Sequence, residues 1–177
     1  MSAIGQHLAE TFVTMLNERD RDLVVAKLFA LIAVLGTAVV YGTDVFCAMV
    51  LRPALAHVDD SALLAVTGNI HRYGDRRMPV PGVLGLVAAV ISAAIAAASG
   101  RWTQAGAAGV AVGLLVVWLV LYLRVSAPIN HQLTAAADHP EAPTDARALQ
   151  GSWDKVITTR ATLQGCAVAA LCLTLLM

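Results

Sequence analysis

The sequence predicts an all-α integral membrane protein: a four-helix bundle with an N-terminal interfacial amphipathic helix and helical long connections that cap one mouth of the bundle. Hydrophobic residues make up 58% of the 177 residues and charged residues 14%, whereas a soluble domain carries about 25% charged residues. The surface of a soluble domain of this size needs more polar cover than these residues provide. Composition therefore excludes an ordinary soluble enzyme and predicts that a lipid bilayer surrounds the chain.

Four apolar runs define the predicted membrane spans, because a helix of roughly 20 residues crosses a bilayer core of about 30 Å. The spans cover approximately residues 28–51, 80–98, 107–123 and 161–177. The third and fourth runs are short, so we expect their polar ends to continue as helix into the interface. Pro79 and Pro81 suit the start of the second span, since the N–H groups of a first helical turn have no helical partner.

The chain before the first span predicts a separate amphipathic segment. Apolar residues recur there at helical spacing, at Ile4, Leu8, Phe12 and Met15. This pattern is typical of a helix that lies on the membrane surface, and a frayed polar tail is the alternative. The length of the segment and its acidic residues argue against a cleavable signal peptide. We therefore divide the chain into an N-terminal segment, residues 1–24, and a four-span membrane domain, residues 25–177.

The connections between the spans are unequal in length. The second is a short turn that contains glycine, whereas the first and third cover residues 52–79 and 126–160. In a four-span chain these two long connections lie on the same side of the membrane. Both carry apolar residues at helical spacing, and in the first a helix begins near Asp59. We expect a free loop only over residues 135–142, and we expect the helical parts to cap one mouth of the bundle.

Charge indicates an orientation and excludes one class of partner. Twelve basic and twelve acidic residues cancel, so no net field attracts nucleic acid. Most arginines lie in or beside the two long connections. The positive-inside rule then favours long connections in the cytoplasm and both termini outside, in the cell membrane. A polar site built from the same arginines would produce this bias without acting as a topology signal.

Asp44 is the clearest candidate for a functional group. An ionisable side chain inside a span costs about 2.5–3.5 kcal/mol on insertion scales and normally faces the bundle interior with a partner. Tyr41 and Asp44 share one helical face, which Arg52 continues two turns later. The sequence leaves two interpretations open: Asp44 forms a structural ion pair with an arginine near the mouth, or it belongs to a substrate site together with Tyr41.

Two histidines near the same mouth carry the candidate chemistry. His71 and Asp75 are four residues apart, so the carboxylate can orient the imidazole on a helix that continues past Gly74. A metal site would use His71 and His131 with Asp44 or Asp75, although no H-x-x-x-H or H-E-x-x-H spacing exists. Surface histidines without a ligand are the alternative.

Further polar residues gather at this mouth. They are Arg77, Arg124, Asn130, Trp153 and Arg160. Their convergence favours a ligand site, whereas snorkelling arginines and an interfacial tryptophan would explain them without a function. The sequence has no phosphate-binding loop, no G-x-S-x-G motif, no haem-attachment motif and no C-x-x-C pair. No motif therefore identifies a cofactor.

These residues resemble the anthrone oxygenase-like family of small bacterial and fungal membrane proteins, much of which is described as a domain of unknown function. The similarity covers roughly residues 25–177 and rests on Gly42, Met49 to Pro53, Asn69, His71, Tyr73, Asp75, Arg77, Met78, Pro79, Arg124, Pro128, Ile129, Asn130, Gln150, Trp153, Thr159 and Arg160. It implies a four-helix membrane bundle. For the characterised members it also implies oxidation of an aromatic anthrone to an anthraquinone with molecular oxygen and without a well-established cofactor.

Our first functional hypothesis is an oxygenase-like membrane enzyme that oxidises an aromatic or quinol-type hydrophobic small molecule. His71, oriented by Asp75, acts as the base, and Arg160 belongs with them to the catalytic set. The substrate-binding set consists of Tyr41, Asp44, Arg77, Arg124, Asn130 and Trp153. Arg124, Asn130 and Arg160 would hold the anion that forms, and Trp153 would supply an aromatic wall.

Two other functions stay open. One is a non-enzymatic membrane subunit, either an accessory of a larger complex or a binder of a lipid or quinone. The small residues of the second span would permit close helix contacts within such a complex or a homo-oligomer. The other is a metal or haem site that uses His71 and His131.

Overall fold

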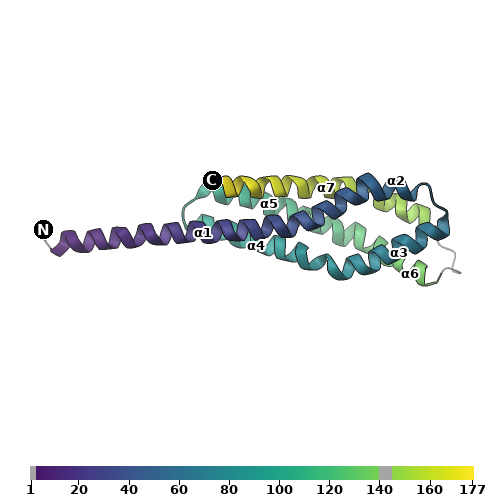
Figure 1. The fold of residues 1–177 in the computed structure, drawn as a ribbon, viewed down its shortest axis with the longest axis horizontal. Coiled ribbons are helices and arrows are strands. Elements are labelled where there is room, and N and C mark those ends of the chain that lie inside the picture. Colours follow the sequence, from purple (N-terminus) through teal and green to yellow (C-terminus); the bar gives the residue numbers. More distant parts are fainter. Residues whose placement is uncertain (1–2, 140–144) are drawn as a thin grey trace.

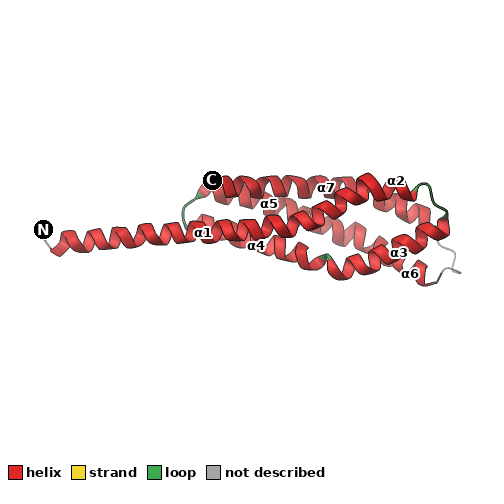
Figure 2. Cartoon of the chain, in the orientation of Figure 1, coloured by secondary structure: helices red, strands yellow, loops and turns green. Residues whose placement is uncertain are grey.

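The computed structural model describes residues 3–139 and 145–177, and this part of the chain is helical almost throughout, without a strand (Figure 2). Its helices are α1 (Ala3–Phe46), α2 (Arg52–Leu55), α3 (Asp60–Arg77), α4 (Pro79–Ala98), α5 (Trp102–Leu121), α6 (Ala127–Asp138) and α7 (Ala146–Leu176). Two π-helical turns, η1 (Cys47–Leu51) and η2 (Tyr122–Ser126), lie within the first and third long helices. The prediction of an all-α chain is confirmed.

The helices form four long rods that lie side by side (Figure 1). α1 continues through η1 into α2, and α5 continues through η2 into α6. α3 and α4 follow each other with only Met78 between them, and α7 is the fourth rod. α1 and α5 each contact both α4 and α7, while α3 packs along α6. The two long connections are therefore mostly helical extensions of the rods.

Within the described residues, four helices are long and apolar enough to cross a membrane. They cover Glu18–Leu55, Pro79–Ala98, Trp102–Asp138 and Ala146–Leu176. This finding supports the predicted multi-pass membrane protein. Three of these helices extend well beyond the predicted spans, because the neighbouring polar residues continue the same helix.

No helix boundary separates the N-terminal segment from the first span. α1 runs without a break, and its first turns project beyond the ends of the other rods (Figure 1). Between Glu18 and Leu28 the sequence has neither glycine nor proline, so no residue there breaks the helix. The side chains that would form the predicted amphipathic face precede Glu18 and lie outside those that the structure describes. The position of residues 1–24 on the membrane surface stays a prediction.

Both π-helical turns precede a proline. Pro53 follows η1, and Pro128 follows η2. A proline inside an α-helix lacks an N–H, and its ring collides with the carbonyl group four residues earlier, so a locally widened turn lets the helix continue. Pro128 therefore does not interrupt the third long helix. The free loop predicted over residues 135–142 is wrong for residues 135–138, because α6 continues to Asp138, and residues 140–142 lie outside those that the structure describes.

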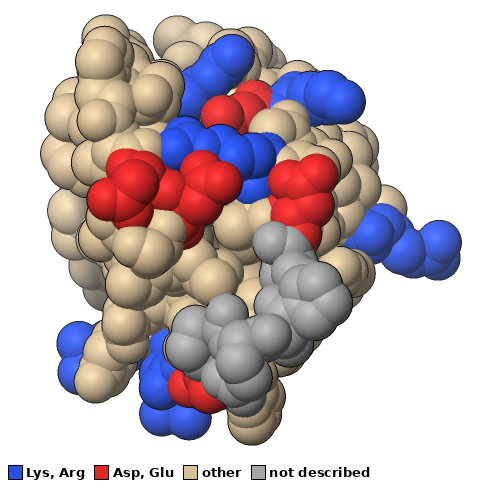
Figure 3. Space-filling model, turned by 90° about the vertical axis from the view of Figure 1, so that its right-hand side faces the viewer, with Lys and Arg blue, Asp and Glu red and all other residues tan. Residues whose placement is uncertain are grey.

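Ion pairs join the rods at the end where the long connections meet. Asp59 caps α3 as its sequence position predicts, accepting a hydrogen bond of 2.8 Å from the backbone N–H three residues later. Arg147, in the first turn of α7, donates to Asp60 at 2.7 Å. Arg72 of α3 pairs with Asp138 of α6. Figure 3 faces this end and shows basic and acidic side chains next to one another rather than a patch of one sign.

Small residues bring α1 and α4 into close contact from Gly36 and Gly85 to Ala26 and Ala96, and this part of the rods is called the closed half. A Cβ atom on Gly36 would lie 2.8 Å from the carbonyl oxygen of Pro81, and one on Gly85 would lie 2.9 Å from Oγ1 of Thr37. Alanines of both helices are buried beside them, at Ala26, Ala30, Ala33, Ala88, Ala89 and Ala96. Close helix approach of this kind is typical of membrane proteins. Gly85, Ala88, Ala89 and Ala96 of the second span therefore pack within the chain.

Candidate functional site

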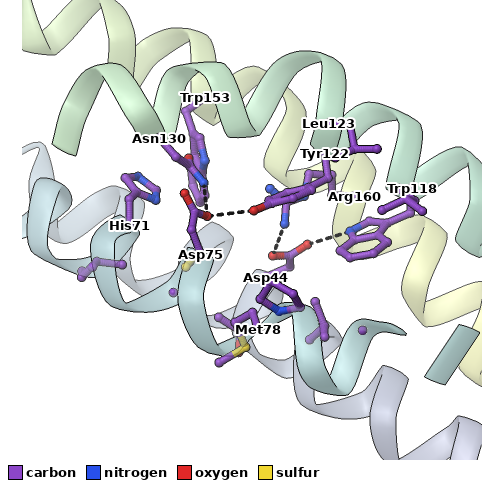
Figure 4. A pocket seen from close by; sticks show the side chains of 18 of the residues that line it. Asp44, His71, Asp75, Met78, Trp118, Tyr122, Leu123, Asn130, Trp153 and Arg160 are labelled. Carbon is purple, nitrogen blue, oxygen red and sulfur yellow. Dashed lines mark hydrogen bonds and ion pairs between the residues drawn. The ribbon is translucent and has the colours of Figure 1, made fainter. Parts of the chain in front are cut away.

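A cavity of about 330 Å³ lies where η1 and η2 face α3, α4 and α7. Most of its lining is apolar, including Val40, Leu51, Ile70, Val83, Leu86 and Leu119. Six of the residues predicted for the site also line it: Asp44, His71, Asp75, Asn130, Trp153 and Arg160. Figure 4 shows these six side chains around one space. Segments distant in the sequence thus supply polar groups to one largely hydrophobic pocket.

A buried ion pair between Asp44 and Arg160 forms one wall of the cavity. The guanidinium Nη2 donates to Asp44 Oδ1 at 2.9 Å, and the two side chains are 5% and 6% exposed. Gln164 donates to the other carboxylate oxygen at 2.7 Å, and Trp118 Nε1 donates to it at 3.4 Å. Arg160 also donates from Nη1 to Ser126 Oγ at 2.8 Å. Asp44 therefore has the structural ion pair that the sequence left as one interpretation, and its partner is the predicted catalytic arginine.

Two aromatic rings of the third rod flank the same guanidinium. Its carbon lies 5.8 Å from the ring centre of Trp118 and 5.5 Å from that of Tyr122. Contacts of this kind stabilise a cation through the ring quadrupole. Trp118 and Tyr122 are stacked on each other, four residues apart on consecutive turns. Arg160 is therefore held from three sides and positioned rigidly against the cavity.

Asp75 joins α3 to the third rod. Its Oδ1 accepts hydrogen bonds from Tyr122 Oη at 2.9 Å and from Asn130 Nδ2 at 2.8 Å. α3 continues past Gly74, as the predicted pairing of His71 with Asp75 requires. Among the described residues, however, no hydrogen bond joins the two side chains. Asp75 therefore positions the third rod, and it acts on His71 through charge alone.

His71 contacts the ring of Trp153 and is 7% exposed. The two ring centres are 5.5 Å apart, with an angle of 57° between the planes. α3 lies outside the four helices that can cross the membrane. Burial lowers the pKa of His71 to about 4. The Asp75 charge opposes this shift, and the Arg160 charge adds to it. The imidazole is therefore neutral near pH 7, with a ring nitrogen that can accept a hydrogen bond.

Four predicted site residues do not line the cavity. Arg124 is exposed, because the inward positions of η2 belong to Tyr122 and Ser126, two residues before and after it. Arg77 is exposed two residues beyond Asp75. Two residues along a helix correspond to about half a turn, so the second side chain points to the opposite side. Both arginines therefore lie away from the cavity.

Tyr41 and His131 are the other two residues outside the cavity. Tyr41 packs across α7, where its ring lies 3.1 Å from a Cβ atom built on Gly165. His131 is exposed, whereas His71 is buried, so the structure does not bring the proposed pair of metal ligands together. Within residues 3–139 and 145–177, no three histidine, cysteine or acidic side chains form a group that could hold a metal ion.

Sequence reasoning missed the residues that hold the ion pair, namely Trp118, Tyr122, Ser126 and Gln164. One signal was available: a carboxylate inside a span needs several hydrogen-bond donors. Gln164 follows Arg160 by one helical turn in an apolar run, and Trp118 precedes Tyr122 by one turn. Polar or aromatic pairs at this spacing share a face, but the sequence alone does not show which rod they face.

No model of a protein family matches the chain, and no curated protein or solved structure matches it. The similarity to the anthrone oxygenase-like family therefore stays a hypothesis. The function must be inferred from the chemistry of the cavity and of the helices around it.

Proposed function

We propose that this protein is a multi-pass enzyme of the cell membrane that binds a weakly acidic aromatic or quinol-type molecule in the cavity and oxidises it with molecular oxygen. In this proposal the four long helices form a four-helix membrane bundle, and α2, α3, α6 and the start of α7 cap the mouth that holds the site. The long connections lie in the cytoplasm. The observation that carries the proposal is a buried, neutral His71 that lies against Trp153 on a largely apolar cavity.

The position of the cavity suits a substrate that arrives from the lipid. α4 has 20 residues and is therefore about 30 Å long, which equals the thickness of a bilayer core. The cavity lies at the Pro79 end of this helix, near one interface. Val83 and Leu123 line it although they are 58% and 56% exposed. A hydrophobic molecule can therefore reach the cavity between these two side chains without crossing water.

The proposed reaction begins with transfer of a proton from an activated C–H group to a ring nitrogen of His71. Arg160, held by Asp44, and Trp153 each have a buried N–H without a partner among the described residues, and these two donors supply fixed dipoles beside the anion that forms. Molecular oxygen is the oxidant. For a methylene between two aromatic rings, the carbon loses two hydrogen atoms and gains one oxygen atom as a carbonyl. The second oxygen atom leaves as water, so each substrate consumes one oxygen molecule.

A non-enzymatic binder of a lipid or quinone is the second candidate, and one observation favours it. The Arg160 charge is already matched by Asp44 at 2.9 Å, so the cavity has no free cation to stabilise an anionic intermediate. Such a protein would bind the same class of molecule but would not consume oxygen. Turnover distinguishes the two candidates.

The test uses the full chain in lipid nanodiscs with anthrone and dissolved oxygen. We expect anthraquinone absorbance to rise while an oxygen electrode records equimolar consumption, at a rate well above that in empty nanodiscs. His71→Gln should lower the rate about 10²-fold or more, the range for loss of a general base. His131→Gln is the matched control, because His131 is exposed and outside the cavity. Equal rates for wild type and His71→Gln would remove the base assignment, and anthrone binding without turnover would favour the second candidate.

A further inference from the structure

Four buried polar atoms of the cavity lining have no hydrogen-bond partner within the described part of the chain. Two are donors, Nε1 of Trp153 and Nε of Arg160, and two are acceptors, Oδ1 of Asn130 and Oε1 of Gln150. All four side chains are more than nine-tenths buried. A buried polar atom without a partner costs about 1–3 kcal/mol. A ligand with matching groups would remove that cost.

The neighbours of both amides determine which end is the free acceptor. Asn130 donates from Nδ2 to the Asp75 carboxylate at 2.8 Å, and Gln150 donates from Nε2 to Asp154 at 2.9 Å. A carboxylate accepts and does not donate, so each amide nitrogen must face it. The oxygen atoms of Asn130 and Gln150 are therefore the acceptors that these two lining residues leave unpaired. Both need a donor from the ligand.

The charges of the lining disfavour an anion. Asp44 and Asp75 contribute two carboxylates, whereas Arg160 contributes one guanidinium, which already pairs with Asp44. His71 is neutral near pH 7 because burial lowers its pKa to about 4. An anionic ligand would therefore lose its hydration next to an excess of negative charge, and this is costly in an apolar cavity.

We infer that the cavity selects a neutral aromatic molecule that carries a hydroxyl group, of the phenol or hydroquinone class, over an aromatic carboxylate of the same size. A hydroxyl group can donate to the oxygen of Asn130 or Gln150 and accept from the indole N–H of Trp153. A carboxylate can only accept, and an unsubstituted hydrocarbon leaves all four atoms unpaired. The cavity volume of about 330 Å³ is at the lower end of the roughly 300–1,000 Å³ of ligand pockets, which suits two or three fused rings.

This inference rests on the proposed function, because it names the substrate class of the same cavity. Three probes of nearly equal shape separate its parts: 2-naphthol, naphthalene and 2-naphthoate. Their affinities for the full chain in lipid nanodiscs are measured by titration calorimetry, with empty nanodiscs subtracted. We expect 2-naphthol to bind about tenfold or more tightly than 2-naphthoate, and about 3- to 10-fold more tightly than naphthalene, the gain of one net hydrogen bond.

Trp153→Phe tests the donor, because it removes the indole N–H and keeps an aromatic wall. It should abolish most of the preference for 2-naphthol over naphthalene. Naphthalene binding by the variant shows that the cavity is still folded. Trp102→Phe is the matched control, since Trp102 is 73% exposed and starts α5 at the other end of the rods, and it should leave all three affinities unchanged.

The outcomes separate this inference from the proposed function. Equal or tighter binding of 2-naphthoate, or an unchanged ratio of 2-naphthol to naphthalene in Trp153→Phe, would overturn the inference and leave aromatic binding intact. Binding of none of the three probes above empty nanodiscs would overturn both. A preference for 2-naphthol in a protein that consumes no oxygen would support the inference and contradict the proposed oxidation.

Discussion

The closed half of the molecule differs from the half that contains the cavity, which we call the cavity half. The same four rods pack in opposite ways in the two halves. In the closed half, Gly36 and Gly85 place the backbones of α1 and α4 in contact. In the cavity half, the rods contain π-helical turns, and large aromatic and charged side chains separate them. Side-chain size therefore decides where the rods touch and where space is left between them.

The two halves also differ in how completely their buried polar groups are hydrogen-bonded. In the closed half, Ser92 donates to the carbonyl oxygen of Ala26 at 2.9 Å, and Gln104 donates to that of Thr174 at 3.0 Å. These bonds link helices, and beside the contact of Gly36 with Gly85 the one buried polar atom left without a partner among the described residues is Oγ1 of Thr37. In the cavity half, the polar side chains bond one another and still leave four buried atoms unpaired among the described residues. Unused hydrogen-bonding capacity thus marks the half that is suited to a ligand.

The largest effect on stability is expected from breaking the ion pair of the cavity half. Arg160→Met leaves the Asp44 carboxylate buried without its cation, which costs about 3–5 kcal/mol. Detergent-titrated unfolding of the purified protein measures this free energy. Adding Asp44→Asn to the variant should recover a large part of the loss, because the uncompensated charge disappears.

Arg124→Met is the control for this comparison. Arg124 is exposed and outside the cavity, so the variant should unfold with nearly the free energy of the wild type. If Arg160→Met proved as stable as Arg124→Met, the ion pair would not be what holds the cavity half together.

A smaller effect should follow from acidification, and His71 carries the part of it that belongs to the cavity half. The folded-state pKa of His71 is about 4, below the value of 6.5 for an unperturbed histidine. As the pH falls from about 7 to about 4, the unfolded state therefore binds a proton that the folded state does not bind. The free energy of unfolding should decrease by up to about 3 kcal/mol over this range through His71.

Unfolding measured against pH in the wild type, His71→Gln and His131→Gln isolates this contribution. His71→Gln should lose the part of the pH dependence that the other two proteins share. A pH profile of His71→Gln that parallels the wild type would show that the histidine is not buried in its neutral form.

The smallest expected effect concerns the closed half. Gly36→Ala places a Cβ atom 2.8–3.0 Å from backbone atoms of α4, so the rods must separate at a cost of about 1–3 kcal/mol. Gly42→Ala is matched on the same helix, because a Cβ there meets no described atom within 4 Å. It should be neutral or stabilising by up to about 1 kcal/mol. Thermal unfolding compares the two, and equal melting temperatures would contradict backbone contact at Gly36.

Much of the fold follows from local features of the sequence. Apolar runs longer than a bilayer core predict the four long helices, and Asp59 predicts the start of α3. The continuation past Pro128 does not follow from the same features, because π-helical turns before a proline depend on tertiary packing. The widened turn also determines which side chains point inward. For this reason Arg124 is predicted in the site, although Tyr122 occupies the cavity.

The candidate site could be predicted from the sequence only in part, because packing between distant helices brings its residues together. The cost of burying an ionisable group points to Asp44 without any structure. Its partner Arg160 lies 116 residues away, and only the packing of α1 against α7 brings the two together. His71 and Trp153 share a cavity for the same reason, whereas His131, close to them in the predicted cap, faces away.

We expect the cavity half, and not the closed half, to receive an aromatic ligand. A photoreactive naphthol, activated in nanodiscs that contain the full chain and followed by peptide mass spectrometry, tests it most directly. We expect labels on cavity residues such as Cys47, Met78 and Leu123, and their loss when excess 2-naphthol competes. Labels spread along the lipid-facing surface of the closed half, or labels that 2-naphthol does not displace, would contradict it.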